Sequence, residues 1–112
     1  GGLMNTYEPN YADWITATQK VFRKHPPLAY AAGHDHNLQL LDAEDFARIE
    51  IVSGAGARDR VSTVTNIEPT IFAHAAEGFV ALDFGTRNGE QVVVVRVVEA
   101  ANPNPVFEMD VP

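Results

Sequence analysis

Apolar and polar positions near the start of the chain follow a helical period. Apolar side chains recur every three or four residues between Tyr11 and Phe22, which places them along one side of a helix. Asn10 is a favourable N-cap residue, Asp13 puts a negative charge in the expected first turn, and Pro26 stops any continuation. We therefore predict an amphipathic helix of about four turns whose apolar side packs against the rest of the protein.

After this helix the pattern changes to short extended runs. Leu28 to Ala32 is a run of apolar and small residues, typical of a buried strand, and Gly33 ends it. Alternating segments predict two hairpins and a last edge strand, at residues 38–41 with 48–52, 77–84 with 91–98, and 106–111. Residues 59–70 fit either an irregular strand or a long loop over the site, and residues 71–76 fit either a strand or a short helix. The predicted fold class is α+β, with one N-terminal amphipathic helix followed by a mostly antiparallel sheet of about six strands.

Composition places the chain among folded globular proteins. It has 112 residues, of which 46% are hydrophobic and 21% charged. The net charge of −7 comes from 15 acidic and 8 basic residues, and the basic residues form no cluster, so we expect no nucleic-acid partner. No apolar run approaches the roughly 20 residues that span a bilayer, so we expect no membrane insertion. With no cysteine there is no disulfide framework and no thiolate chemistry.

Two histidines directly after the predicted strand form the candidate site. His34 and His36 lie two positions apart behind Gly33, which lets the backbone turn tightly so that both rings can face one site. Neutral imidazole is the commonest nitrogen ligand for zinc, manganese and iron. In sheets of this order, ligands collect at the carboxyl ends of strands, which is where these residues fall. The pattern therefore favours a metal site.

The segment Gly33-His34-Asp35-His36 resembles the last signature motif, Gly-His-x-His, of the calcineurin-like metallophosphoesterases, the superfamily that includes purple acid phosphatases. The resemblance implies that His34 binds one metal of a binuclear centre and His36 the other, with zinc, manganese or iron as the ions. It implies hydrolysis of a phosphorylated small molecule or other phosphoester by a metal-bound hydroxide. It also implies a four-layer α/β/β/α fold, in which the turn at Ser53 to Gly56 lies near the metal site without ligating it.

The family's earlier motifs, Asp-x-His, Gly-Asp-x-x-Asp and Gly-Asn-His, do not occur in the sequence. We therefore expect residues 1–112 to form a single domain that corresponds to a C-terminal fragment of a metallophosphoesterase domain. Two imidazoles without a bridging carboxylate cannot hold two cations about 3.5–4 Å apart. We expect the isolated chain to bind metal weakly, to contain no catalytic residue of its own, and to be inactive.

Two other interpretations remain open. The chain could be a non-catalytic β-rich binding or assembly module that self-associates through an exposed sheet edge. It could also be a mononuclear metal enzyme similar to the cupins, although Glu44 follows the histidines at a longer distance than such a site needs. His25 fits a helix-end position better than a ligand position, and His74 fits a packed or surface position unless the fold brings it near His34.

Overall fold

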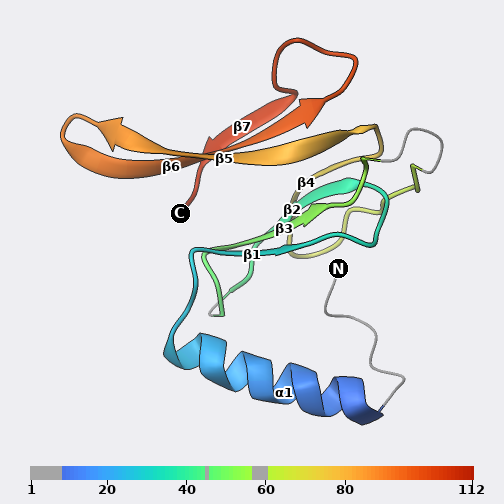
Figure 1. The fold of residues 1–112 in the computed structure, drawn as a ribbon, viewed down its shortest axis with the longest axis vertical. Helices are drawn as coiled ribbons and strands as arrows, with labels where there is room; N and C mark the ends of the chain where they lie inside the picture. The colour runs from blue at the N-terminus through green and yellow to red at the C-terminus, as the bar shows by residue number, and fades with distance from the viewer. Residues whose placement is uncertain (1–8, 45, 57–60) are drawn as a thin grey trace.

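The computed structural model describes residues 9–44, 46–56 and 61–112, and this part of the chain forms one helix and two β-sheets (Figure 1). Helix α1 spans Pro9–Lys24 and precedes all the strands. The first sheet has the strand order β1-β3-β2-β4, formed by Ala29–Ala32, Ile49–Ser53, Leu38–Leu41 and Thr70–His74. The second has the order β5-β6-β7, formed by Gly78–Arg87, Glu90–Glu99 and Phe107–Asp110.

The α+β class with an N-terminal helix and mostly antiparallel strands is confirmed. The strands divide between two sheets, however, rather than forming one, and residues 70–74 form a strand. Strands β1 and β3 pair in parallel. Strand β2 pairs antiparallel with both β3 and β4, and both pairs of the second sheet are antiparallel. The likeness to a four-layer α/β/β/α domain stays a prediction.

The predicted hairpin near the C-terminal end is confirmed, with strands longer than expected. Residues 85–87 continue β5 instead of forming the turn, because Asn88 and Gly89 alone reverse the chain. Both have positive φ, at 54° and 81°, which suits the two-residue turn whose twist matches antiparallel strands. The predicted edge strand is also confirmed, since β7 forms one border of the second sheet.

The hydrophobic core lies between the two sheets. β2 and β3 supply Leu38, Leu40, Ile49 and Ile51, and these pack with residues of β6 that include Val95. One aromatic ring from each sheet completes the contact, because Phe72 and Phe107 stack with ring centroids 4.5 Å apart. Apolar residues at alternate positions along these strands form the core, because every second side chain of a strand points to the same face of its sheet.

Helix α1 contacts the rest of the protein mainly near its C-terminal end. Phe22 lies 5.8 Å from the ring of Tyr30 and 6.3 Å from the ring of Phe46, centroid to centroid. The helix begins at Pro9, so Asp13 lies in the second turn and not, as predicted, in the first. No helix in the described part of the chain is long and apolar enough to cross a membrane.

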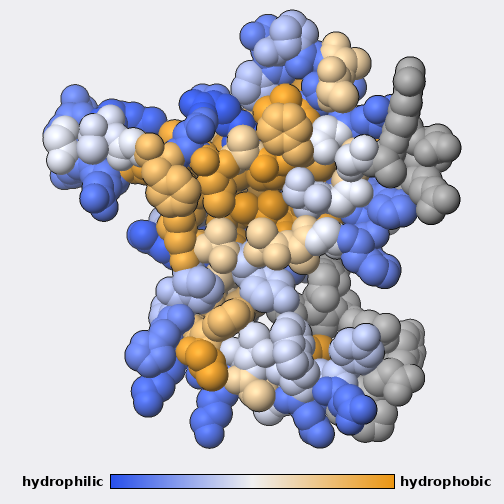
Figure 2. Space-filling model, viewed as in Figure 1, coloured by the Kyte–Doolittle hydropathy of each residue, from blue (hydrophilic) through white to orange (hydrophobic). Residues whose placement is uncertain are grey.

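The prediction that the whole apolar side of α1 packs against the protein is wrong. Tyr11, Trp14 and Val21 remain 50%, 51% and 57% exposed. The apolar stripe is wider than the surface that contacts the protein, and within the stripe Ile15, Thr18 and Phe22 are the partly buried residues. Figure 2 shows a large apolar region over the strands and smaller apolar patches over α1.

Glu50 gives the first sheet a pH-dependent stability. Its carboxyl is partly buried on β3, and burial raises its pKa above the ordinary value of 4.5 because the charged form is disfavoured. The folded state therefore holds the proton more tightly than the unfolded state, and stability falls as the pH rises through this range. We expect Glu50→Gln to raise the thermal unfolding midpoint at pH 7 and to lose that advantage in acid below the ordinary carboxyl pKa.

Circular dichroism melts at neutral and acidic pH measure this effect. Glu90→Gln is the matched control, because Glu90 is exposed at the start of β6 and its charge is not buried. An unchanged or lower midpoint for Glu50→Gln at pH 7 would contradict the account.

Candidate metal-binding loop

The two candidate ligands lie in the short loop between β1 and β2, at the carboxyl end of β1. Because β3 runs parallel to β1, its carboxyl end reaches the same edge of the sheet, where Ser53 is followed by Gly54. This placement agrees with the expectation that the histidines follow the end of a strand at a site where ligands collect.

His34, rather than Gly33, makes the turn. The backbone of His34 is left-handed, with φ at 75°, whereas Gly33 does not have a positive φ. The expected role of Gly33 is therefore wrong, because a side chain at that position would meet no atom within 4 Å. A left-handed conformation costs a residue with a Cβ about 1–2 kcal/mol, so the surrounding contacts must hold it. The side chain of His34 is nevertheless 96% exposed.

Backbone hydrogen bonds fix the loop on both sides. The Asn37 N–H donates to the Asp35 carbonyl at 2.8 Å, which closes the turn around His36. The His36 carbonyl accepts the Ser62 N–H at 2.8 Å, and the Asn37 carbonyl accepts the Gly54 N–H at 3.2 Å. The loop is thus tied both to the end of β3, at Gly54, and to Ser62.

The buried side chain of Asn37 adds hydrogen bonds from the loop to residues 62 and 63 and to Gln39 of β2. Asn37 is 4% exposed, and its amide nitrogen lies 3.4 Å from both the Ser62 hydroxyl and the Thr63 carbonyl. Its amide oxygen accepts a hydrogen bond from Gln39, which is 8% exposed, at 2.8 Å. Among the described residues, no buried side-chain nitrogen or oxygen lacks a partner. A satisfied buried network of this kind limits the conformations of the loop.

Gly54 allows β3 to approach the loop closely. A Cβ on Gly54 would clash with the backbone carbonyl of Asp35. The prediction that the segment at residues 53–56 lies beside the candidate site without ligating is confirmed for its position. Residues 57–60 lie outside the described part of the chain, and 59 and 60 among them belong to the predicted irregular stretch. Residues 61–67 form no helix or strand.

The donor groups of the loop suit a metal but do not complete a site. His34 is exposed, His36 is partly buried, and the Asp35 carboxylate lies 3.5 Å from the His34 Nδ1 atom. Imidazole nitrogen is an appropriate ligand for zinc, manganese or iron. Within residues 9–44, 46–56 and 61–112, no three His, Cys, Asp or Glu side chains form a group that could hold an ion. The described residues therefore fit the role of contributing ligands, and no hydrolytic step can be assigned to them alone.

The remaining histidines have other positions. β4 places His74 opposite Leu38, next to the loop, but its Nε2 atom lies 3.3 Å from the Glu99 carboxylate across the two sheets. His25 follows the last turn of α1, where its backbone N–H donates to Val21. Neither belongs to a group of three potential ligands in the described chain.

The cupin-like interpretation finds no support in the position of Glu44. This residue follows the end of β2, whereas His34 and His36 precede the start of that strand. The glutamate and the histidines therefore lie at opposite ends of one strand.

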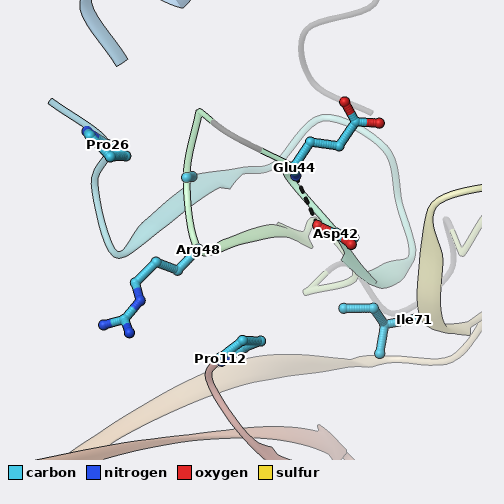
Figure 3. A pocket seen from close by; sticks show the side chains of 7 residues that line it. Pro26, Asp42, Glu44, Arg48, Ile71 and Pro112 are labelled. Carbon is cyan, nitrogen blue, oxygen red and sulfur yellow. Dashed lines mark hydrogen bonds between the residues drawn. The ribbon is translucent and has the colours of Figure 1, made fainter. Parts of the chain in front are cut away.

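A hollow of about 360 Å³ lies at the end of β2 that is remote from the histidines (Figure 3). Nothing in the sequence pattern indicated it. Figure 3 shows Glu44 and Arg48 pointing in different directions, so the charged groups do not converge on one point. The Asp42 carboxylate accepts a hydrogen bond from the backbone N–H of Glu44 at 2.8 Å. The hollow is lined by Pro26, Asp42, Glu44, Ala47, Arg48, Ile71 and Pro112.

No protein-family model matches the chain, and no curated protein sequence matches it. A solved structure of GAP50, the anchor in the inner membrane complex of Plasmodium, is similar to it, with a TM-score of 0.62 and 18% sequence identity. The similarity covers 96% of this chain and 30% of the GAP50 chain. At this identity the likeness establishes the fold alone. It assigns neither an activity nor an anchoring role.

Gly54 provides a direct test of the close contact between β3 and the loop. We expect Gly54→Ala to destabilise the protein by about 1–3 kcal/mol, because the added methyl group clashes with backbone that cannot move without shifting the loop. Urea denaturation measures the change.

Gly56→Ala is the matched control, since a Cβ at that position would meet no atom within 4 Å. A loss of stability of the same size in both variants would show that the effect comes from the backbone of the segment and not from the contact with the loop.

Proposed function

We propose that this chain is the part of a metal-dependent phosphoesterase domain that supplies His34 and His36 as metal ligands. The other ligands come from polypeptide outside the described residues. The substrate of the complete enzyme is a phosphorylated small molecule or another phosphoester. The chain by itself does not hydrolyse phosphate esters.

The observation that carries this proposal is the conformation of His34. Its side chain is 96% exposed and gains nothing from packing, yet its backbone is held at a φ of 75°. Strained backbone of this kind persists where surrounding contacts over-determine it, and it concentrates at functional sites. The buried Asn37 amide and the approach of Gly54 supply those contacts. The loop therefore holds the backbone of His34 in one conformation and exposes its imidazole.

Each group in the loop has a role in holding a metal. The Asp35 carboxylate, 3.5 Å from the His34 Nδ1 atom, favours a proton on that nitrogen and leaves Nε2 as the ligand atom. His36 supplies the second imidazole from the same loop. The chemistry that a metal supplies when bound here is Lewis-acid activation of water and of a phosphoester.

The comparison with GAP50 supports the proposal that this fold is one part of a larger domain. The similar region makes up 30% of the GAP50 chain, so this fold also occurs as part of a longer polypeptide. Two histidines on one loop need further ligands, and a longer polypeptide can bring them to the carboxyl end of β1.

A second candidate function is a non-catalytic assembly module. The exposed apolar side chains of Tyr11, Trp14 and Val21 favour it, because half-exposed aromatic residues on a helix are typical of interaction surfaces. The two functions are compatible, since they use different parts of the chain.

Metal binding by the isolated chain tests the proposal. We expect zinc or manganese to bind weakly, with a dissociation constant of about 10 μM to 1 mM, because only two ligands are present. Zinc titration followed by NMR should perturb the imidazole signals of His34 and His36 before those of His25 and His74. The chain should not hydrolyse p-nitrophenyl phosphate with any of these metals.

Variants separate this site from adventitious binding. His34→Ala and His36→Ala should each abolish the perturbation, whereas His25→Ala and His74→Ala should leave it unchanged. Binding that survives in the double variant of His34 and His36 would overturn the ligand assignment. Metal-dependent hydrolysis by the pure wild-type chain would overturn the prediction that the chain is incomplete.

A further inference from the structure

Strand β5 is an outer strand of the second sheet, and in the described chain it pairs with β6 alone. In an antiparallel pair, alternate residues direct their backbone N–H groups toward the partner strand and the others away from it. The N–H groups of Gly78 and Val80 point away from β6, because they donate to the Ala55 carbonyl at 3.0 Å and to the Ser53 hydroxyl at 3.1 Å. The first half of the β5 edge is therefore closed by the end of β3 and the residues after it.

The second half of the β5 edge is open. By the same alternation the N–H groups of Phe84 and Thr86 point away from β6, and neither makes a hydrogen bond with any other described residue. This end of the β5–β6 hairpin projects past the strands of the first sheet (Figure 1), and the Phe84 side chain is 70% exposed. Neither a proline nor a bulge, two features that protect a strand edge from pairing, occurs between Leu82 and Arg87.

The charges of this open edge are arranged symmetrically about Gly85. Asp83 lies two residues before Gly85 and Arg87 lies two residues after it, on the face of the sheet where they pair with Arg96 and Asp110. An antiparallel second copy of the segment, centred on Gly85, places each Asp83 opposite Arg87 of the other copy. Opposite charges directly across two strands stabilise their pairing, whereas like charges destabilise it. The open edge is thus complementary in charge to itself.

We propose that residues 82–87 of β5 pair antiparallel with the same residues of a second copy of this chain, about a two-fold axis at Gly85. A two-fold axis brings the same surface of both copies together. Phe84 of each copy then lies opposite Thr86 of the other, and each such pair exchanges two main-chain hydrogen bonds. The two exposed Phe84 rings become diagonal neighbours on the other face of the sheet. The second sheet thereby continues from one copy into the next.

The length of the open edge fits this register. With Gly85 at the centre, the turn residue Asn88 of one copy lies opposite Leu82 of the other. The next outward N–H group of that other copy, at Val80, already donates to Ser53. The hairpin of each copy therefore ends where the open edge of the other copy ends. The remaining outer strands are shorter, since β1 and β7 have four residues each and β4 has five, with a register shift in its pairing.

The small size of the contact predicts a weak dimer. It consists of one short strand segment from each copy, whereas stable interfaces bury about 1,200–2,000 Å². The dimer therefore forms at high protein concentration and dissociates on dilution. This inference does not rest on the metal proposal, because the open edge contains neither His34 nor His36.

Charge reversal tests the proposed pairing by sedimentation equilibrium of the full chain. The wild type should be monomeric at about 10 μM and show a rising dimer fraction toward about 1 mM. Asp83→Lys and Arg87→Glu should each raise the dissociation constant about tenfold, because each places two pairs of like charges across the axis. An equimolar mixture of the two variants should dimerise again. In the mixed dimer the new lysine faces the new glutamate, and the unchanged Arg87 faces the unchanged Asp83.

Glu90→Lys is the matched control for these variants. It changes the net charge by the same amount as Asp83→Lys, but Glu90 lies on β6 and not on the open edge. This variant should dimerise as the wild type does, and all variants should keep the circular dichroism spectrum of the wild type. A wild-type chain that stays monomeric to about 1 mM would overturn the proposal. A mixture that is no more dimeric than its separate variants would overturn it as well.

Cysteine cross-linking tests the position of the axis, because the chain has no native cysteine. A Cβ on Gly85 would meet no atom within 4 Å, so Gly85→Cys fits the strand. At the axis the two Cα atoms lie about 4.5 Å apart, which a disulfide can span. Gly85→Cys should therefore form a covalent dimer on oxidation, whereas Glu90→Cys should stay monomeric. Equal cross-linking of both variants would contradict the proposed pairing. Zinc binding has no bearing on these results, so the two proposals fail separately.

Discussion

The buried amide of Asn37 is the constraint on which the candidate site depends. It joins the loop after β1 to residues 62 and 63, which lie 25 and 26 positions further along the chain. Gly54 permits the end of β3 to reach the same loop. Without these contacts nothing would offset the cost of the left-handed backbone at His34, from which the imidazole projects. A polar network that is fully satisfied can hold such strain because breaking any member leaves a buried group without a partner.

The strands and helix α1 differ in how much of their apolar surface is buried. Leu38, Ile49 and Val95 lie in a shared core from which water is excluded. Helix α1 is attached chiefly through Phe22, Tyr30 and Phe46, and a large share of its apolar surface stays in water. The strands therefore form the stable body that carries the candidate loop, while the helix extends from it with part of its apolar side exposed.

Much of the fold was predictable because the signals for strands and turns are local. Alternation identified the strands of both hairpins, and the pair Asn88 and Gly89 fixed the tight turn between β5 and β6. The division into two sheets was not predictable, since it depends on contacts between distant strands such as that of Phe72 with Phe107. The exposure of Tyr11, Trp14 and Val21 was missed for a related reason, because periodicity shows that one side of a helix is apolar but not which part of that side is covered.

The position of the candidate site was predictable from the sequence, whereas the contacts that hold its loop were not. The pair His34 and His36 after a strand was visible in the sequence, whereas the role of Asn37 depends on Ser62 and Thr63, which no local pattern connects to it. The backbone of the turn also differed from expectation, because its left-handed residue is a histidine that follows a glycine. Such a choice is intelligible where the histidine side chain itself is needed at that position.

The central claim is that the loop after β1 holds a metal through its two imidazoles. A crystal structure of the chain grown with zinc, with anomalous data collected at the zinc edge, tests it most directly. We expect an anomalous peak about 2.0–2.1 Å from a ring nitrogen of both His34 and His36, with the loop backbone unchanged. Zinc bound only at other residues, while both imidazoles remain unligated, would contradict it.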